Sequence, residues 1–294
     1  MGATDSPPDR FILSGRSARL DPRIYAVRGD IADLALAGVL FAPHYARPLP
    51  RICLAPYQTL HAQPSAAAAA ISQVLRGEQF AIVDISGDWA WGYTLHDHYV
   101  GYVPAGILGE EAPASHRIVQ RSALIFAAAD ARSPVLGTLP MGARFPAAQH
   151  GDFLEMPDGH VHIRHAAPLD DVAADPVAFA EKLVGTPYYW GGRGGDGIDC
   201  SGLVQIAHGM AGIALPRDSD LQLAAAIGRD IPAGDPLRRG DLIFLPGHVA
   251  MMVDAENAIH ASGHAMTVTI EPLATLLARF AQEDGAVLAQ RRLS

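Results

Sequence analysis

Residues 186–205 read Thr186-Pro-Tyr-Tyr-Trp-Gly-Gly-Arg-Gly-Gly-Asp-Gly-Ile-Asp-Cys-Ser-Gly-Leu-Val-Gln205, which sets a cysteine directly after a glycine-rich turn. Apolar residues then recur at helical spacing up to Gly209 and Gly212, which predicts a helix of about three turns starting at Cys200. Asp199 is its expected N-cap. A thiol in the first turn lies near unpaired N–H groups and the positive end of the helix dipole, which favours the thiolate. We therefore interpret Cys200 as a nucleophile.

The composition describes a globular chain. Of its 294 residues, 49% are hydrophobic and 18% are charged, which allows about two or three domains. The net charge of -9, without any run rich in Lys or Arg, argues against a nucleic-acid partner. No signal sequence and no run of the ~18 apolar residues of a membrane span is found, so we expect a cytoplasmic protein. Ser6 fits the N-terminal lipidation pattern only loosely.

The two cysteines are expected to differ in role. Two cysteines cannot form a disulfide framework, and the one at position 200 must stay free to react, so a reducing compartment fits best. Cys53 lies in the apolar run Arg51-Ile-Cys-Leu-Ala55, which is typical of a buried core thiol.

The first third of the chain predicts an arm and a small barrel. Residues 1–48 are rich in Pro and Arg, include a helical segment at residues 31–38, and are expected to pack on other domains. Residues 49–110 predict a small β-barrel, with a short helical insertion where residues 65–71 are rich in Ala. Its expected strands are residues 52–54, 79–85, 89–94 and 99–103.

A second unit of similar layout is predicted for residues 111–168. The likeness of residues 75–80 to residues 139–145 suggests an internal repeat. Its expected strands are residues 123–127, 135–139, 142–146, 152–156 and 160–164.

Residues 169–294 predict a domain with helices first and strands after them. A linker leads to Asp175 and Pro176, which suit the N-cap and first position of a helix that runs to residue 184. A second short helix is expected after the one that begins at Cys200. The strands then expected are residues 241–245, 248–253, 258–261 and 266–270. This order is that of an α+β domain with an antiparallel sheet.

Two histidines are candidates for the base that a thiol nucleophile needs and for the group that orients this base. His248 begins an apolar strand, and His260 is embedded in the apolar next strand. Either ring alone could be a core histidine, whereas together they predict a triad with Cys200. His264 is a rival to His260, but it is expected in a turn. The sequence leaves open the strand register that decides whether both rings share a face.

Two other patterns resemble binding sites. Residues 192–197 satisfy GxGxxG, but no strand precedes them as a dinucleotide site requires. His160 and His162 alternate on an expected strand, and His96 and His98 have a similar spacing, but no third ligand completes either set. We therefore expect no cofactor and no metal.

Residues from about 175 to 275 resemble the catalytic domain of the NlpC/P60 cysteine peptidases. The resemblance implies a papain-like fold and cleavage of murein peptides, most often between γ-linked D-glutamate and a diamino acid. It also implies that Cys200 attacks the carbonyl, that His248 is the base, that His260 orients it, and that the Tyr188 hydroxyl lies near the oxyanion. The motifs that carry it are Gly185-Thr-Pro-Tyr-Tyr-Trp-Gly-Gly192, Gly197-Ile-Asp-Cys-Ser-Gly-Leu-Val-Gln205, Leu215-Pro-Arg-Asp-Ser219, Gly240-Asp-Leu-Ile-Phe244, Gly247-His-Val249 and Ala258-Ile-His-Ala261.

Both preceding units resemble bacterial SH3-like domains, the first of them well at Gly101-Tyr-Val-Pro104 and the second poorly. This arrangement resembles a subgroup that trims free peptides with an N-terminal L-Ala. The resemblance to that subgroup implies that Trp190, Asp199 and Ser201 line the substrate pocket. A buried ammonium needs carboxylate partners, and we expect Asp199 and, from the barrel, Glu78 to supply them.

The sequence thus predicts a γ-D-glutamyl-L-diamino acid endopeptidase whose partner is a murein peptide. Two rival functions stay open. One is a binding module that grips wall peptides without cleaving them, and the other is a thiol amidase or acyltransferase with a different substrate. The intact set of Cys200, His248 and His260 argues against the first.

Overall fold

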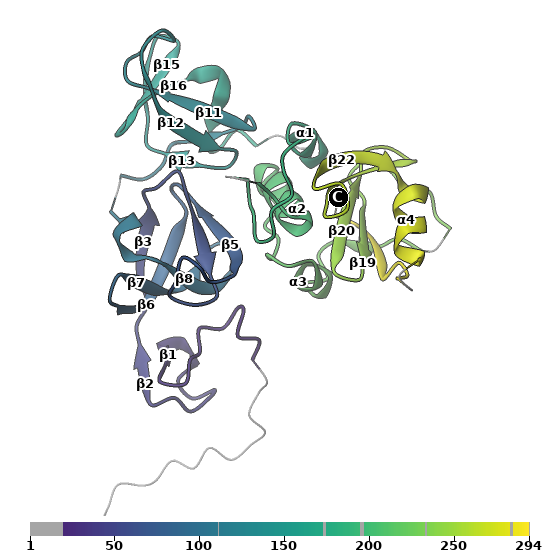
Figure 1. The fold of residues 1–294 in the computed structure, drawn as a ribbon, viewed down its shortest axis with the longest axis horizontal. Coiled ribbons are helices and arrows are strands. Elements are labelled where there is room, and N and C mark those ends of the chain that lie inside the picture. The colour runs from purple at the N-terminus through teal and green to yellow at the C-terminus, as the bar shows by residue number, and fades with distance from the viewer. Residues whose placement is uncertain are drawn as a thin grey trace, which may run out of the picture.

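The structure is a computed structural model that describes residues 20–110, 112–172, 175–194, 197–232, 234–282 and 285–293. Two small β units, one above the other, lie beside a unit of helices and one sheet (Figure 1). The predicted α+β class with all-β units in front is confirmed. We propose residues 49–110, 111–168 and 169–294 as the bounds of these units and residues 1–48 as the arm.

The first unit is a 7-stranded sheet in the order β5-β4-β8-β7-β6-β3-β9. Leu60, Val74, Phe80 and Val103 form its interior with Cys53, which is fully buried as predicted. Burial raises the pKa of the Cys53 thiol to about 12, so it is inert. The strands are β3 (Leu49–Cys53), β4 (Tyr57–His61), β5 (Ala70–Leu75), β6 (Gln79–Ser86), β7 (Trp89–Thr94), β8 (Val100–Pro104) and β9 (Leu108–Gly109), with the 3₁₀ turn η2 (Ala105–Ile107) before β9.

Two predicted helices were wrong. Within residues 65–71, the last two begin strand β5, which pairs with β4, because strand pairing overrides the weak helix preference of alanine. In place of a helix at residues 31–38, β1 (Ile31–Asp33) pairs with β2 (His44–Ala46), and a 3₁₀ turn, η1 (Leu34–Leu36), follows. The Asp33 side chain accepts a hydrogen bond from the Ala35 N–H and so caps a new turn in the middle of the expected helix.

The second unit contains a 5-stranded sheet, β12-β11-β16-β15-β14, and a 3-stranded sheet, β13-β10-β17. Ile118, Leu139, Phe145 and Leu154 form its core. The strands are β10 (His116–Ile118), β11 (Ser122–Phe126), β12 (Val135–Pro140), β13 (Arg144–Phe145), β14 (Ala148–His150), β15 (Phe153–Met156), β16 (Gly159–His162) and β17 (Ala166–Pro168), with the 3₁₀ turn η3 (Ile163–His165) before β17.

The third unit has a 6-stranded antiparallel sheet in the order β18-β23-β19-β20-β21-β22. Helices α1 and α2 cover one face and α4 covers the other (Figure 1). Sequence reasoning missed α4, β18 and β23. The helices are α1 (Pro176–Glu181), α2 (Cys200–Met210), α3 (Ser219–Ala224) and α4 (Leu273–Ala281), and the strands are β18 (Arg229–Asp230), β19 (Leu242–Leu245), β20 (His248–Met252), β21 (Asn257–Ser262), β22 (Thr267–Pro272) and β23 (Ala289–Arg292).

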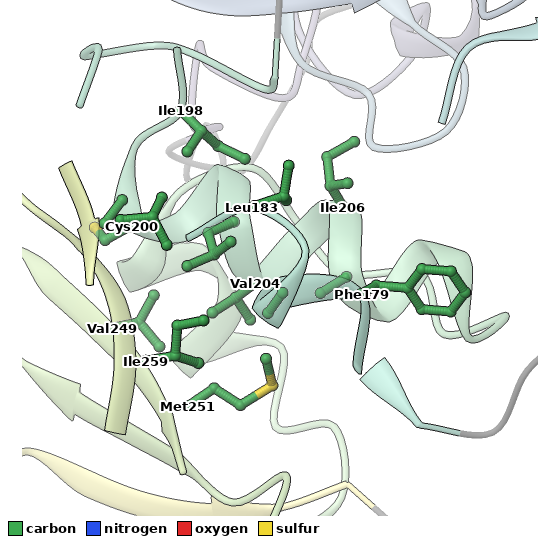
Figure 2. Packing of buried hydrophobic residues seen from close by; sticks show 14 of the residues in the cluster. Phe179, Leu183, Ile198, Cys200, Val204, Ile206, Val249, Met251 and Ile259 are labelled. Atoms are coloured by element: carbon green, nitrogen blue, oxygen red, sulfur yellow. The ribbon is translucent and has the colours of Figure 1, made fainter. Parts of the chain in front are cut away.

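Strand alternation divides the residues of β20 between the two faces of the sheet. Val249 and Met251 pack with Val204 of α2 in the core shown in Figure 2, whereas Ala250 and Met252 face the α4 side. Helix α2 is thereby fixed on the sheet, and its first residue, Cys200, comes next to the start of β20. Among the helices of the described residues, none is long and apolar enough to cross a membrane.

Candidate active site

The cysteine lies where the sequence predicts it, at the first position of α2. The Asp199 carboxylate caps the helix, accepting a hydrogen bond of 2.7 Å from the Gly202 N–H. Cys200 is 7% exposed, and the N–H of Val249 lies close enough to the thiol to lower its pKa as a hydrogen-bond donor. The backbone of His248, which precedes Val249 and begins strand β20, therefore lies close to the thiol.

The thiol and the adjacent imidazole are both neutral in the resting protein. Burial, assisted by the Asp199 carboxylate, raises the pKa of the Cys200 thiol to about 12. Burial also lowers the pKa of His248 to about 3, helped by the charges of His260 and Arg279. The expected resting thiolate was wrong, because desolvation next to a carboxylate outweighs the backbone N–H groups at the helix start.

The two histidines meet, because the strand register places both rings on one face. Met251 pairs with Ile259 and Met252 with Ala258 across β20 and β21, so His248 and His260 project on the α4 side. His248 Nε2 and His260 Nδ1 are 2.9 Å apart. The rings meet edge to face at a centroid distance of 4.9 Å. His264, the rival, forms no such contact in the described structure.

Sequence reasoning missed a carboxylate behind His260. His260 Nε2 lies 2.7 Å from Glu271 Oε1. Arg279 of α4 donates two hydrogen bonds to Glu271, of 3.0 Å to Oε1 and 2.7 Å to Oε2. The available signal was the antiparallel pairing of β21 with β22, which brings residue 271 opposite Ala258 on the face that His260 shares.

Two adjoining cavities meet at Gly247 beside the cysteine. The histidine cavity, of about 210 Å³, is lined by His248, His260, Tyr188 and Arg279, among others. The thiol cavity, of about 340 Å³, holds Cys200. Its lining combines the arm, the first unit and the third unit: Arg23, Ile71, Tyr99, Trp190, Asp199, Ser201, Asp218, Ser219 and Asp220.

Two aromatic residues of the predicted site line these cavities. Burial and the charges of Cys200 and Asp199 raise the pKa of the Tyr188 phenol to about 12, so it keeps its proton. Tyr188 can therefore donate a hydrogen bond in the histidine cavity. Trp190 is 67% exposed and stands in the lining of the thiol cavity.

Asp199 and Ser201 are tied to a buried arginine. Arg217, which is 1% exposed, donates to both Asp199 oxygens at 2.9 and 2.6 Å and to the Ser201 hydroxyl at 2.9 Å. The Gly191 N–H also donates to Asp199. The predicted cap is confirmed, but its carboxylate is already neutralised by a cation, so it is a poor acceptor for an ammonium group.

Glu78 is not in this site, which corrects the prediction. It is 6% exposed, pairs with Arg193 through bonds of 2.7 and 3.0 Å, and accepts a further bond from the Leu75 N–H. It lines a different cavity, of about 330 Å³, together with His96 and Arg193. Glu78 therefore joins the first barrel to the loop before α2 and has no contact with the thiol cavity.

Other acidic residues stand where Glu78 was expected. Asp218 lies in the thiol cavity, where its Oδ2 accepts from the Tyr99 hydroxyl and from Arg23, both at 2.8 Å. Arg23 also donates hydrogen bonds of 3.0 and 2.7 Å to the Asp220 carboxylate. Asp218 belongs to the motif at residues 215–219, so its position could be suspected from the sequence, whereas nothing in the sequence pointed to Arg23.

The second barrel approaches neither cavity, but the first one contacts the loop before α2 closely. Gly191 has a φ of 81°, and a Cβ there would lie 3.0 Å from the backbone of Ala70 in strand β5. Only glycine allows both the positive φ and this approach. Gly191 thus serves domain packing, whereas a Cβ at Gly192 or Gly197 would meet other atoms of the same loop. Residues 195–196 of the GxGxxG pattern lie outside the described residues.

A cysteine that begins a helix, packed on an antiparallel sheet that carries a histidine pair, fits the papain-like fold class. Residues 185–279 match the NlpC/P60 family, and residues 60–108 match the bacterial dipeptidyl-peptidase SH3 domain. The chain therefore carries an NlpC/P60 domain behind a bacterial SH3 domain.

Similar proteins align with this chain over most of their own length. Dipeptidyl-peptidase 6 of Lysinibacillus sphaericus is 28% identical over 249 residues, which are 76% of this chain and 91% of the relative. A γ-D-glutamyl-L-lysine dipeptidyl-peptidase of Bacillus cereus is 27% identical, over 69% of this chain and 71% of its own. The crystal structure of an NlpC/P60 family protein from Bacillus cereus has the same fold, with a TM-score of 0.71 at 21% identity, covering 83% of this chain and 99% of that one. The family match and the two sequence relatives support a peptidase, and the solved structure shows the shared fold.

Proposed function

We propose that the chain is a cysteine peptidase of cell-wall turnover or recycling, which hydrolyses the γ-D-glutamyl–diamino acid bond of murein peptides with a free N-terminal L-Ala. The observation that carries the proposal is the hydrogen-bonded pair His248–His260 next to Cys200, at a cavity that the first barrel closes. The name of the Bacillus cereus relative, a γ-D-glutamyl-L-lysine dipeptidyl-peptidase, supports the choice of bond.

The proposed reaction starts from a neutral thiol. His248 takes the thiol proton through Nδ1 as the sulfur of Cys200 attacks the carbonyl carbon, and the Tyr188 hydroxyl donates a hydrogen bond to the oxygen that becomes negative. The C–N bond then breaks, the amine leaves with the proton from His248, and a thioester remains on Cys200. A water molecule gives a proton to His248 and attacks the thioester, which releases the acid and returns the proton to the thiol.

The lining of the thiol cavity supports a short acyl part of the substrate. Ile71 and Tyr99 of the first barrel and Arg23 of the arm line this cavity together with Cys200. A long glycan strand or a longer peptide before the scissile bond would meet this wall. The cavity thereby favours a peptide with only a short segment on that side, as L-Ala-γ-D-Glu is.

Asp218 replaces Glu78 as the proposed partner of the substrate ammonium. Its Oδ2 is engaged by Tyr99 and Arg23, while its Oδ1 accepts no hydrogen bond from the described residues. Burial raises the pKa of Asp218, so an ammonium beside it would stabilise the ionised form. Asp199, by contrast, has both oxygens bonded to Arg217.

Incubation with L-Ala-γ-D-Glu-meso-diaminopimelate and mass analysis of the products tests the proposal. We expect L-Ala-γ-D-Glu and free diaminopimelate, and a loss of at least ~100-fold in kcat/KM when the amine is acetylated, since acetylation removes the charge and its hydrogen bonds. Asp218→Asn should shrink that preference for the free amine. If the peptide is not cleaved, the proposed bond is wrong. If free and acetylated peptides are cleaved equally, the proposed selectivity for the free amine is wrong.

A further inference from the structure

The histidine pair belongs to a longer chain of groups that ends on a fixed charge. His248 Nε2 meets His260 Nδ1 at 2.9 Å, and His260 Nε2 meets Glu271 Oε1 at 2.7 Å. Arg279 holds both oxygens of Glu271. The two histidines and the glutamate come from three neighbouring strands, β20, β21 and β22, and the arginine comes from α4. This series of hydrogen-bonded side chains extends from His248 away from Cys200. It lies outside the cavity wall that is proposed to contact the peptide.

We propose that Glu271, held by Arg279, is a positioning residue that sets the tautomers of both histidines, so that His248 presents an unprotonated Nδ1 to Cys200. The proposal rests on the peptidase mechanism above, since it concerns the base of that reaction.

The Glu271 carboxylate determines which ring nitrogen carries the proton in each histidine. An ionised carboxylate only accepts hydrogen bonds, so the Nε2 of His260 must carry a proton to donate to Glu271. A neutral His260 then has a bare Nδ1, which can only accept. His248 must therefore donate from Nε2 to His260, and a neutral His248 is left with its lone pair on Nδ1.

This constraint matters because the resting pair is neutral. With Cys200 and His248 both uncharged, the base works only in the tautomer whose free nitrogen meets the thiol. If His260 donated to His248 instead, the proton of His248 would lie on Nδ1, and the thiol would meet a donor. When His248 accepts the thiol proton, the negative charge of Glu271 also stabilises the imidazolium through His260.

The surroundings keep Glu271 ionised and in place. The paired Arg279 lowers the pKa of Glu271, and the bond to His260 adds to this effect. The side chain of Glu271 is 15% exposed and that of His260 only 1%. The charged or titratable groups around these side chains include Arg279 from α4, His264 and Tyr188 at the histidine cavity, and Asp199, whose charge acts on His248.

Glu271→Gln tests the proposal with little change of shape. A glutamine amide can either accept or donate, so it no longer selects one tautomer of His260. We expect kcat to fall about 10- to 100-fold with KM nearly unchanged, since partners one step behind a functional histidine typically act at this scale. Arg279→Lys keeps a cation and should cost less. Glu256→Gln, at an exposed turn of the same sheet, is the matched control and should leave kcat unchanged.

Two readouts separate this proposal from the proposed substrate. Alkylation of Cys200 by iodoacetamide needs no peptide, and its rate should fall about 10-fold in Glu271→Gln. The ¹⁵N shifts of the ring nitrogens should show a proton on Nε2 of both histidines in the wild type and a mixture of tautomers in the variant. Unchanged alkylation and unchanged shifts would overturn the role of Glu271, even if the peptide is cleaved. If Glu271→Gln fails to fold, Arg279→Gln in the same measurements decides instead.

Discussion

The interactions on the two sides of Cys200 differ in the sequence separation and in the charge of the residues that they join. On the side of the sheet, hydrogen bonds join residues only 12 and 11 positions apart, and the groups nearest the thiol are neutral. On the side of the first barrel, arginine–carboxylate pairs such as Arg193–Glu78 and Arg23–Asp218 join residues 115 and 195 positions apart. The first side supplies a base, whereas the second holds the domains together and, through Asp218, lines the thiol cavity. Mutations on the two sides should therefore fail in different ways.

The largest effect is expected at the thiol that both sides share. Cys200→Ala should lower kcat/KM by roughly 10⁴-fold or more, because no other nucleophile is proposed. Cys200→Ser should do nearly the same, since His248 is placed to accept a thiol proton and a hydroxyl is far less acidic. Thermal unfolding should be nearly unchanged in both variants. Substantial turnover by Cys200→Ala would refute the mechanism.

On the sheet side, the losses should decrease with distance from the thiol. His248→Ala should cost roughly 10³-fold in kcat because it removes the base, and His260→Ala should cost less because it removes only the orienting ring. Glu271→Gln should cost less again. Steady-state kinetics of the three variants at one pH checks this gradient. A reversed order of the two histidine variants would exchange their roles.

On the barrel side, the expected loss is of stability. Glu78→Ala leaves the guanidinium of Arg193 buried without its partner, which should lower the free energy of unfolding by about 3 kcal/mol. Since Glu78 has no contact with the thiol cavity, kcat/KM of the folded protein should fall less than ~10-fold. Denaturant unfolding and kinetics on the same samples separate the two effects.

Matched variants sharpen this prediction. Glu110→Ala removes an exposed partner of Arg51 and should change stability by less than about 0.5 kcal/mol. Replacing both Glu78 and Arg193 by apolar residues should recover part of the loss, since no charge is then left unpaired. If Glu78→Ala is as stable as the wild type but inactive, the original assignment of Glu78 to the substrate would be restored.

The same contrast explains what the sequence could predict. The cysteine, its cap and the two histidines follow one another in a local order of helix and strands, so periodicity and motifs placed them. Glu271 was within reach, because it pairs across the next hairpin, but the register was open. Arg23, and the partner of Glu78, could not be predicted, because pairs so distant in the chain leave no pattern in it. The prediction of a helix at residues 65–71 was wrong for a related reason, since strand pairing outweighed the local helix propensity.

The smallest effect we predict concerns the charge of the thiol itself. Because burial raises the pKa of Cys200 to about 12 and lowers that of His248 to about 3, neither group changes its protonation between about pH 5 and 9. Acid charges His248 only below that window, and base removes the thiol proton only above it. The ultraviolet absorbance of a thiolate should therefore be absent throughout the window. The measurement is the difference spectrum between wild type and Cys200→Ala, in which Cys53 cancels. A constant thiolate signal at pH 6 would mean that the pair is an ion pair at rest. His248 would then carry both protons, no tautomer would need selecting, and Glu271 would act only by stabilising the imidazolium.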